Sequence, residues 1–145
     1  MSNAESSPSA AARNPRSVEL RVAALLENLA VVRTVIGALA TFEDLDLDAV
    51  ADLKLAVDEA CTRLIRSASN DAALLLVVDP RDHELVVKVS TVSTSSASDV
   101  LTPGSFSWHV LTSLTDDVQM FNDGADIDAP VVGIALTTRR VSPAR

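Results

Sequence analysis

Residues 52–65 read DLKLAVDEACTRLI, and this stretch decides the fold. The apolar side chains of this stretch, together with Val50 before it, recur mostly at steps of three and four residues. This is the spacing of one buried stripe on an amphipathic helix. The stripe consists of Val50, Leu53, Val57, Cys61, Leu64 and Ile65. Asp46 or Asp48 can cap this helix at its start, and the pattern carries it to about Ser69.

The opposite face of the same helix carries charge. Glu59, Arg63 and Arg66 share it at helical spacings, and a glutamate four residues before an arginine is the favourable order for a side-chain ion pair, worth about 0.3 to 0.5 kcal/mol. The spacing alone therefore predicts that Glu59 is half of a surface ion pair. Cys61 lies on the apolar stripe, where a small buried hydrophobe is a simpler interpretation than a redox sensor.

The composition restricts the class of protein. The 145 residues suit one domain with a single core, and one cysteine excludes an internal disulfide and fits a reducing compartment. A net charge of -8 argues against direct binding of nucleic acid, which needs clustered Lys and Arg. No apolar run is long enough to span a membrane and no signal peptide is evident, so we expect a cytoplasmic protein.

The chain before the helix divides into three parts. Residues 1–16 are rich in Ser, Ala, Asn and Pro and predict a disordered tail. Residues 17–25 predict an edge strand, and residues 26–42 a helix. The apolar arc of that helix is wide, which either a partner subunit or deep burial explains. The arc consists of Leu25, Leu29, Val31, Val32, Val35, Ile36, Ala38 and Leu39.

The chain after the helix predicts mainly strands. Residues 72–79 and 83–92 form a plausible hairpin around the turn 80–82. Residues 107–120 predict a helix followed by a strand, and the adjacent acids Asp116 and Asp117 there more simply end the helix than catalyse a reaction. Residues 130–140 have the continuous apolar run of a buried central strand.

Two of these segments carry a family resemblance. Residues 52–65 resemble the first helical box, LAVxEAxTN, of the RsbW-type anti-sigma factors, small serine kinases of the GHKL ATPase superfamily, and residues 107–120 resemble the family's LxLIxxLMDDVxV passage. The resemblance covers residues 17–140, leaving 141–145 as a C-terminal tail. It implies a two-layer α/β sandwich of the GHKL (Bergerat) type, with a mixed or antiparallel sheet packed against helices.

The resemblance also identifies what is altered. Its glutamate, which polarises the attacking hydroxyl, is Glu59, but its magnesium-holding asparagine is Arg63, which has no oxygen to offer a hard cation. The adenine-binding aspartate corresponds to Thr91 and the first glycine of its turn to Ser93. The mobile lid shrinks to residues 94–102.

The phosphate-binding turn at the end of the lid is altered as well. Glycines there let backbone amides wrap the terminal phosphates; this chain has Ser105, Phe106, Ser107 and Trp108. The two aromatic side chains would fill space that a phosphate needs, although serine hydroxyls could still give one weak nucleotide contact. We therefore expect no cofactor and no metal, with phosphoryl transfer lost because positioning and charge neutralisation are both impaired.

The resemblance implies protein partners for a fold kept after its kinase site decayed. These are an alternative sigma factor of the stress or sporulation type and a STAS-fold anti-sigma antagonist, with a homodimer as the expected assembly. The family's partner-binding arginine corresponds to Arg33, which is otherwise a solvated arginine at a stripe edge. Two alternatives stay open: a divergent serine kinase that uses Mg-ATP, with Glu59 as base and Arg63 or Arg66 binding phosphate, and a binding module unrelated to transcription.

Overall fold

The computed structural model describes residues 14–123 and 129–141. Five strands form one sheet in the order β1-β2-β3-β5-β4, and every neighbouring pair is antiparallel. The strands are β1 (Val18–Ala23), β2 (Ala73–Pro80), β3 (Glu84–Val92), β4 (Asp117–Asp123) and β5 (Val131–Arg139). Of the two sheet types that the sequence leaves open, the antiparallel one is found.

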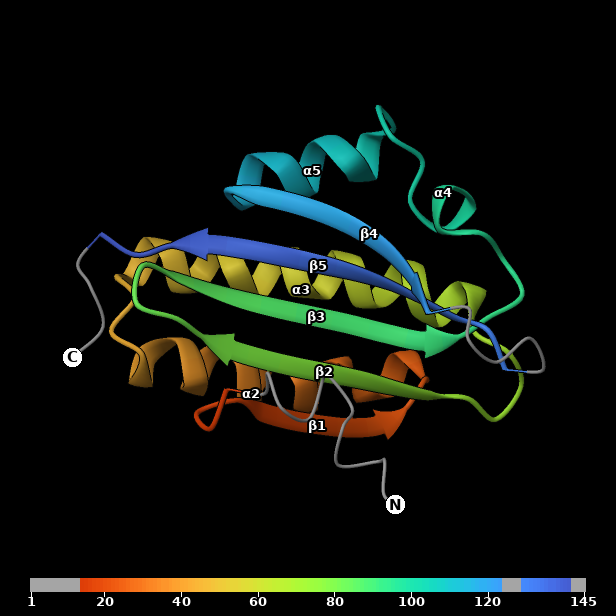
Figure 1. The fold of residues 1–145 in the computed structure, drawn as a ribbon, viewed down its shortest axis with the longest axis horizontal. Helices are drawn as coiled ribbons and strands as arrows, with labels where there is room; N and C mark the ends of the chain where they lie inside the picture. The colour runs from red at the N-terminus through yellow and green to blue at the C-terminus, as the bar shows by residue number, and fades with distance from the viewer. Residues whose placement is uncertain (1–13, 124–128, 142–145) are drawn as a thin grey trace, which may run out of the picture.

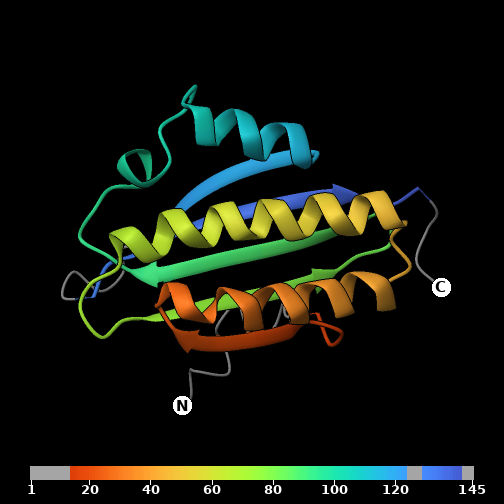
Figure 2. The same cartoon turned by 180° about the vertical axis from the view of Figure 1, so that it is seen from behind.

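Helices cover one face of this sheet. Figure 2 shows the two long helices lying side by side across it, with a third beside the edge strand β4, whereas Figure 1 views the face that no helix of the described chain covers. The helical segments are η2 (Leu26–Asn28), α2 (Leu29–Phe42), α3 (Leu47–Ser67), α4 (Ala97–Val100) and α5 (Phe106–Leu114). The predicted two-layer α/β sandwich is confirmed.

Helix α3 forms as its sequence predicts. Asp46 is the N-cap, and its side chain accepts a 2.8 Å hydrogen bond from the amide of Ala49. Such a cap typically contributes about 1 kcal/mol by satisfying a donor that the helix itself leaves free. Its fully buried residues face the sheet, and Val50 and Ile65 pack at the margin of the core. The fully buried residues are Leu53, Ala56, Val57, Ala60, Cys61 and Leu64.

Helix α2 begins later and is less buried than its sequence suggests. A 3-10 turn precedes it, so Leu25 lies outside the helix and is half exposed. Only Val32, Ile36 and Ala40 are buried, whereas Val31 is 48% exposed. Deep burial is therefore the wrong explanation for the wide apolar arc of this helix.

The strands follow the predicted pattern. Strands β2 and β3 form the hairpin, β1 is an edge strand paired to β2, and β5 lies between β3 and β4 as a central strand. Alternate side chains of β2 are buried against the helices, as expected for a sheet covered on one face. Asp116 and Asp117 lie beyond the end of α5, and the Asp116 carboxylate accepts a 2.6 Å hydrogen bond from the amide of Arg139.

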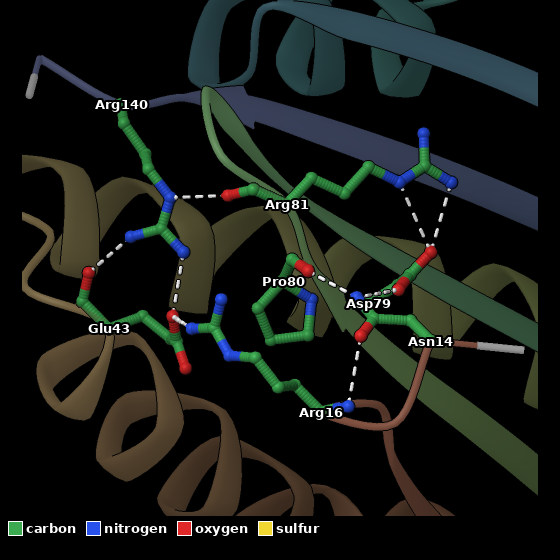
Figure 3. A network of polar contacts seen from close by, with 7 residues as sticks. All are labelled: Asn14, Arg16, Glu43, Asp79, Pro80, Arg81 and Arg140. Carbon is green, nitrogen blue, oxygen red and sulfur yellow. Dashed lines mark hydrogen bonds and ion pairs between the residues drawn. The ribbon is translucent and has the colours of Figure 1, made fainter. Parts of the chain in front are cut away.

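A buried polar network closes the corner where α2, the β2–β3 turn and β5 meet (Figure 3). Glu43 and Arg140 have side chains only 8% and 4% exposed, and the Arg140 guanidinium lies 2.6 Å from the Glu43 carboxylate. It also donates to the carbonyls of Glu43, at 2.5 Å, and Arg81, at 2.9 Å. Arg16 joins from the N-terminal side, 2.5 Å from the same carboxylate oxygen.

The ordered contacts of the chain begin before β1. Asn14 donates to the Asp79 carboxylate at 2.9 Å, and Arg16 belongs to the Glu43 network, so residues 14–16 of the predicted tail lie against the domain. The rest of that tail, and residues 142–145 at the C-terminal end, fall outside the described residues. No helix within residues 14–123 and 129–141 combines the length and apolar content needed to cross a bilayer.

Candidate functional site

Two of the candidate nucleotide positions, Arg63 and Ser107, come together around Glu59, on the side of α3 that faces α5. The Ser107 hydroxyl donates a 2.6 Å hydrogen bond to Oε2 of Glu59. The Arg63 Nε lies 3.4 Å from the same oxygen, one helical turn along. The sequence predicted the ion pair between Glu59 and Arg63; the contact of Ser107, 48 residues away, comes from the tertiary structure.

This ion pair is a weak contact. Both side chains are about one-third exposed, and Arg63 Nε lacks hydrogen-bond geometry to any acceptor in the described chain. Exposed pairs at this helical spacing contribute only about 0.3 to 0.5 kcal/mol. The pair matters for chemistry, because the permanent charge of Arg63 lies beside Glu59, the carboxylate that the resemblance implies is a base. A divalent cation brought to this place would meet that positive charge.

A shallow cavity of about 220 Å³ adjoins Arg63 and the segment before α5. Its wall is mainly polar. The residues that line it are Arg63, Asp99, Val100, Leu101, Thr102, Ser105, Phe106 and Ser107. Phe106 is 84% exposed, so it borders the cavity and does not fill it. Trp108 is absent from this lining and packs against the core, so the expectation that its ring occupies phosphate space is wrong.

The segment that would wrap phosphate is capped by its own serines. Ser105 is the N-cap of α5, and its hydroxyl accepts a 3.2 Å hydrogen bond from the amide of Trp108. Ser96 caps the short helix α4 in the same way, accepting from the amide of Asp99 at 3.2 Å. Each cap satisfies an amide that a glycine turn would leave free for an anion.

Thr91 and Ser93, the two positions that the resemblance assigns to adenine binding, donate their hydroxyl hydrogen bonds within the protein. The Thr91 hydroxyl donates to the carbonyl of Ala73 at 2.8 Å, and Thr91 is only 3% exposed. The Ser93 hydroxyl donates to the carbonyl of Ser67 at 2.6 Å, which fastens the last residue of α3 to the end of β3. Ser93 is 1% exposed. Neither hydroxyl is presented to a ligand.

The metal-ligand types do not gather in this region. Among residues 14–123 and 129–141, no three His, Cys, Asp or Glu side chains lie close enough together to hold an ion. The donor set at the altered site is one carboxylate, an arginine and hydroxyls, which does not fit the near-octahedral oxygen shell of magnesium.

Arg33 lies away from this site, on the face where α2 meets α3. Its Nη2 and Nε donate to one oxygen, Oδ2, of Asp58 at 2.8 and 3.2 Å. Both side chains remain partly exposed, at 43% and 28%. The sequence indicated Arg33 and missed Asp58, because the two residues are 25 positions apart and no short-range spacing links them. Neither Arg33 nor Asp58 touches the Glu59 cavity.

Cys61 is a buried thiol with no exposed surface. Burial, with a smaller contribution from the charge of Asp58, raises its pKa from 9.0 to about 12. A thiol held protonated at neutral pH is a poor nucleophile and a poor metal ligand.

The raised pKa of Cys61 predicts that the folded protein loses stability at alkaline pH. Above about pH 9 the unfolded chain releases the Cys61 proton while the folded chain keeps it until about pH 12. The free energy of unfolding should therefore fall by about 1.4 kcal/mol per pH unit within this window. The chain has no tyrosine and only two lysines, so few other groups titrate there.

Urea unfolding at a series of pH values from 7 to 11 measures this slope, and Cys61→Ala is the matched control because it removes the titrating group. The same slope in both proteins would contradict the assignment.

Two comparisons with known proteins agree with this geometry. Residues 22–129 match the model of the histidine kinase-like ATPase domain. The anti-sigma-F factor RsbW of Mycobacterium tuberculosis strain CDC 1551 is 62% identical over 135 residues, which are 92% of this chain and 79% of that protein. The protein of the same name from strain H37Rv gives the same values. The resemblance inferred from the sequence is confirmed, and the chain belongs to the RsbW-type anti-sigma factors of the histidine kinase-like (GHKL) ATPase superfamily.

Proposed function

We propose that this protein acts by sequestration: it binds an alternative sigma factor of the stress or sporulation type and is countered by a STAS-fold antagonist, without phosphorylating it. The observation that carries the proposal is the internal bonding of the altered nucleotide positions. Glu59 is held by Ser107 and Arg63, and Thr91 and Ser93 donate to backbone carbonyls. The name of the Mycobacterium tuberculosis relative supports a sigma factor as the partner.

The loss of kinase activity follows from what phosphoryl transfer requires. Catalysis of that reaction is mostly positioning and neutralisation of phosphate charge by metal ions and backbone amides. At the metal position stands the permanently charged guanidinium of Arg63. The amides of Asp99 and Trp108 are already bonded to the capping serines Ser96 and Ser105. We accordingly assign no Mg-ATP cofactor. Because sigma factors act on RNA polymerase, we place the protein in the cytoplasm.

The rival kinase interpretation has less support. It needs Arg63 or Arg66 to bind phosphate and Glu59 to take a proton. Arg63 does line the cavity, but it is paired with Glu59, and Arg66 is exposed outside the cavity lining. Family membership likewise weighs against a binding module unrelated to transcription.

The first test of the proposal is nucleotide binding. Calorimetry with millimolar Mg-ATP should give no saturable heat, because the three altered elements act together. Arg63→Asn alone should not restore phosphotransfer to a STAS-fold antagonist, since the serine caps and the closed adenine end remain. A micromolar dissociation constant for Mg-ATP, or phosphoserine on the antagonist after this single change, would defeat the proposal.

Binding of the sigma factor is the direct test. We expect purified Mycobacterium tuberculosis sigma-F to bind this protein equally well with and without Mg-ATP, since its near relative is an anti-sigma-F factor. The RsbW relative itself is the positive control. Failure of this chain to bind while the relative binds would refute sequestration of an F-type sigma factor.

We also propose a homodimer formed through α2 and the neighbouring edge strand β1. Val31 and Val18 are exposed apolar residues on these two elements, at 48% and 38%. Val31→Asp would bury an unpaired charge in such an interface and should give monomers. Thr41→Asp, an exposed position near the end of the same helix, is the control and should leave the dimer intact. Light scattering at tens of micromolar decides, and a monomeric unaltered protein refutes the dimer.

A further inference from the structure

We infer that Asp58 is a positioning residue, which fixes the Arg33 guanidinium so that its outer edge receives a carboxylate of the sigma factor. The inference rests on the proposed sequestering function and extends it from one contact residue to a pair. The pair joins the two helices of the exposed helical layer, Arg33 from α2 and Asp58 from α3.

The geometry of the pair leaves donors free on one side. A guanidinium has five N–H donors in a planar fork. Nε and Nη2 of Arg33 both point to Oδ2 of Asp58, so one edge of the fork is engaged. Within the described chain these are the hydrogen bonds of this guanidinium, and its side chain is 43% exposed. The edge formed by Nη1 and the outer N–H of Nη2 therefore has no acceptor within the described chain, and it has the spacing that a carboxylate binds in two-pronged fashion.

The other carboxylate oxygen of Asp58 points into the fold. Its Oδ1 is buried and has no hydrogen-bond partner in the described chain. The inward direction of the carboxylate also accounts for its contribution to the raised pKa of Cys61, one turn further along α3. With Oδ1 buried on the inner side, Oδ2 is the oxygen that accepts both hydrogen bonds from Arg33, which limits the directions in which the pair can form.

The surface around the pair suits close approach by another protein. The exposed neighbours of Arg33 on α2, Ala30 and Thr34, are small, and Gly37 one turn on is partly covered by the Lys54 side chain. Leu55, one turn before Asp58 on α3, is 57% exposed. A partly exposed arginine with small exposed neighbours on its own helix, and with Lys54 and the apolar Leu55 on the adjacent helix, fits a partner segment that presents an acidic residue beside an apolar one.

Fixing the arginine before binding is what gives Asp58 its effect. A free arginine loses rotamer freedom when it is captured, and this loss opposes association. Asp58 restricts that freedom in advance through the edge of the fork that the partner does not need. Two carboxylates then share one guanidinium from different sides.

The test measures affinity for purified Mycobacterium tuberculosis sigma-F by titration calorimetry. Asp58→Ala should weaken binding about 3- to 10-fold, the range expected for losing preorganisation of one side chain. In an Arg33→Ala background the same change should have no further effect, since Asp58 acts through Arg33. Asp58→Asn, which keeps the acceptor oxygen and the shape, should recover part of the loss. Asp52→Ala, the same change of charge on the same helix, should leave affinity unaltered.

The outcomes separate this inference from the function on which it rests. No binding of sigma-F by the unaltered protein overturns both. Normal binding by the unaltered protein, with unchanged or tighter binding by Asp58→Ala and Asp58→Asn, overturns the role of Asp58 alone. An equal loss from Asp58→Ala with and without Arg33 also overturns it, because a general structural effect would not depend on the arginine. Thermal unfolding of each variant establishes that folded proteins are compared.

Discussion

Replacing Arg140 with methionine should lower the free energy of unfolding by about 3 to 5 kcal/mol, the range found when one partner of a buried ion pair is removed. Arg140 is 4% exposed and donates in three directions, to the Glu43 carboxylate, the Glu43 carbonyl and the Arg81 carbonyl. Methionine has similar length and no donor. All three acceptors lose a partner, although Arg16 still contacts the Glu43 carboxylate.

A matched control stands next to it in sequence. Arg139 is exposed, and its backbone amide donates a hydrogen bond to the Asp116 carboxylate. Arg139→Met should change stability by less than about 0.5 kcal/mol, as is usual for surface positions. Arg140→Lys should fall between the two, because an ammonium can keep the charge contact but cannot reach three acceptors in one plane. Urea unfolding of the three variants makes the comparison. An Arg140→Met protein within about 1 kcal/mol of the unaltered one, a difference near the average for point mutations, would contradict the expected loss.

Removing the Arg33 side chain should weaken the complex with sigma-F by about 1 to 3 kcal/mol, or roughly 5- to 150-fold. The guanidinium has a free edge toward solvent, and Arg33→Lys should recover only part of the loss, since a point charge cannot make a planar two-pronged contact. Fold stability should fall by less than about 1 kcal/mol, because the ion pair with Asp58 is partly exposed.

Affinity and thermal stability must be measured together for these variants. A loss of affinity for sigma-F and for the STAS antagonist at nearly constant stability identifies an interface arginine. Unchanged affinity for both partners would return Arg33 to the solvated surface. The internal ion pair modifies the expectation from sequence, since a solvated arginine would leave stability wholly unaffected.

The fold could be predicted from sequence where local pattern and burial agree. The spacing of Leu53, Val57, Cys61 and Leu64 predicts one buried stripe, and the same residues are buried in α3. The apolar run of residues 131–136 predicts a central strand, and β5 is indeed paired on both sides, with β3 and β4. The start of α2 was harder, because Leu25 continues the apolar spacing but belongs to a turn whose geometry depends on the preceding strand.

The site was predictable only in part. Local spacing predicts the contact between Glu59 and Arg63, four residues apart on one helix. The contacts of Ser107 with Glu59 and of Asp58 with Arg33 join residues 48 and 25 positions apart, so they depend on how helices pack. The same holds for Arg140. Its side chain is buried because the pairing of β5 with β3 brings it to Glu43 and Arg81, and no local sequence pattern predicts these contacts. Trp108 was misplaced because a helix start can turn an aromatic ring either to a cavity or to the core.

The strand order has a consequence for how the protein is made. Strand β5 lies between β3 and β4 but is the last of the five along the chain, so β4 has no neighbour to pair with until residues 131–139 have been synthesised. The sheet is therefore completed by insertion of β5 between β3 and β4, after the other four strands have been synthesised. A ribosome that stops before β5 releases a chain in which one edge of β3 and both edges of β4 are unpaired, and such edges invite aggregation. An unfinished copy would thus be recognisable to quality-control proteases.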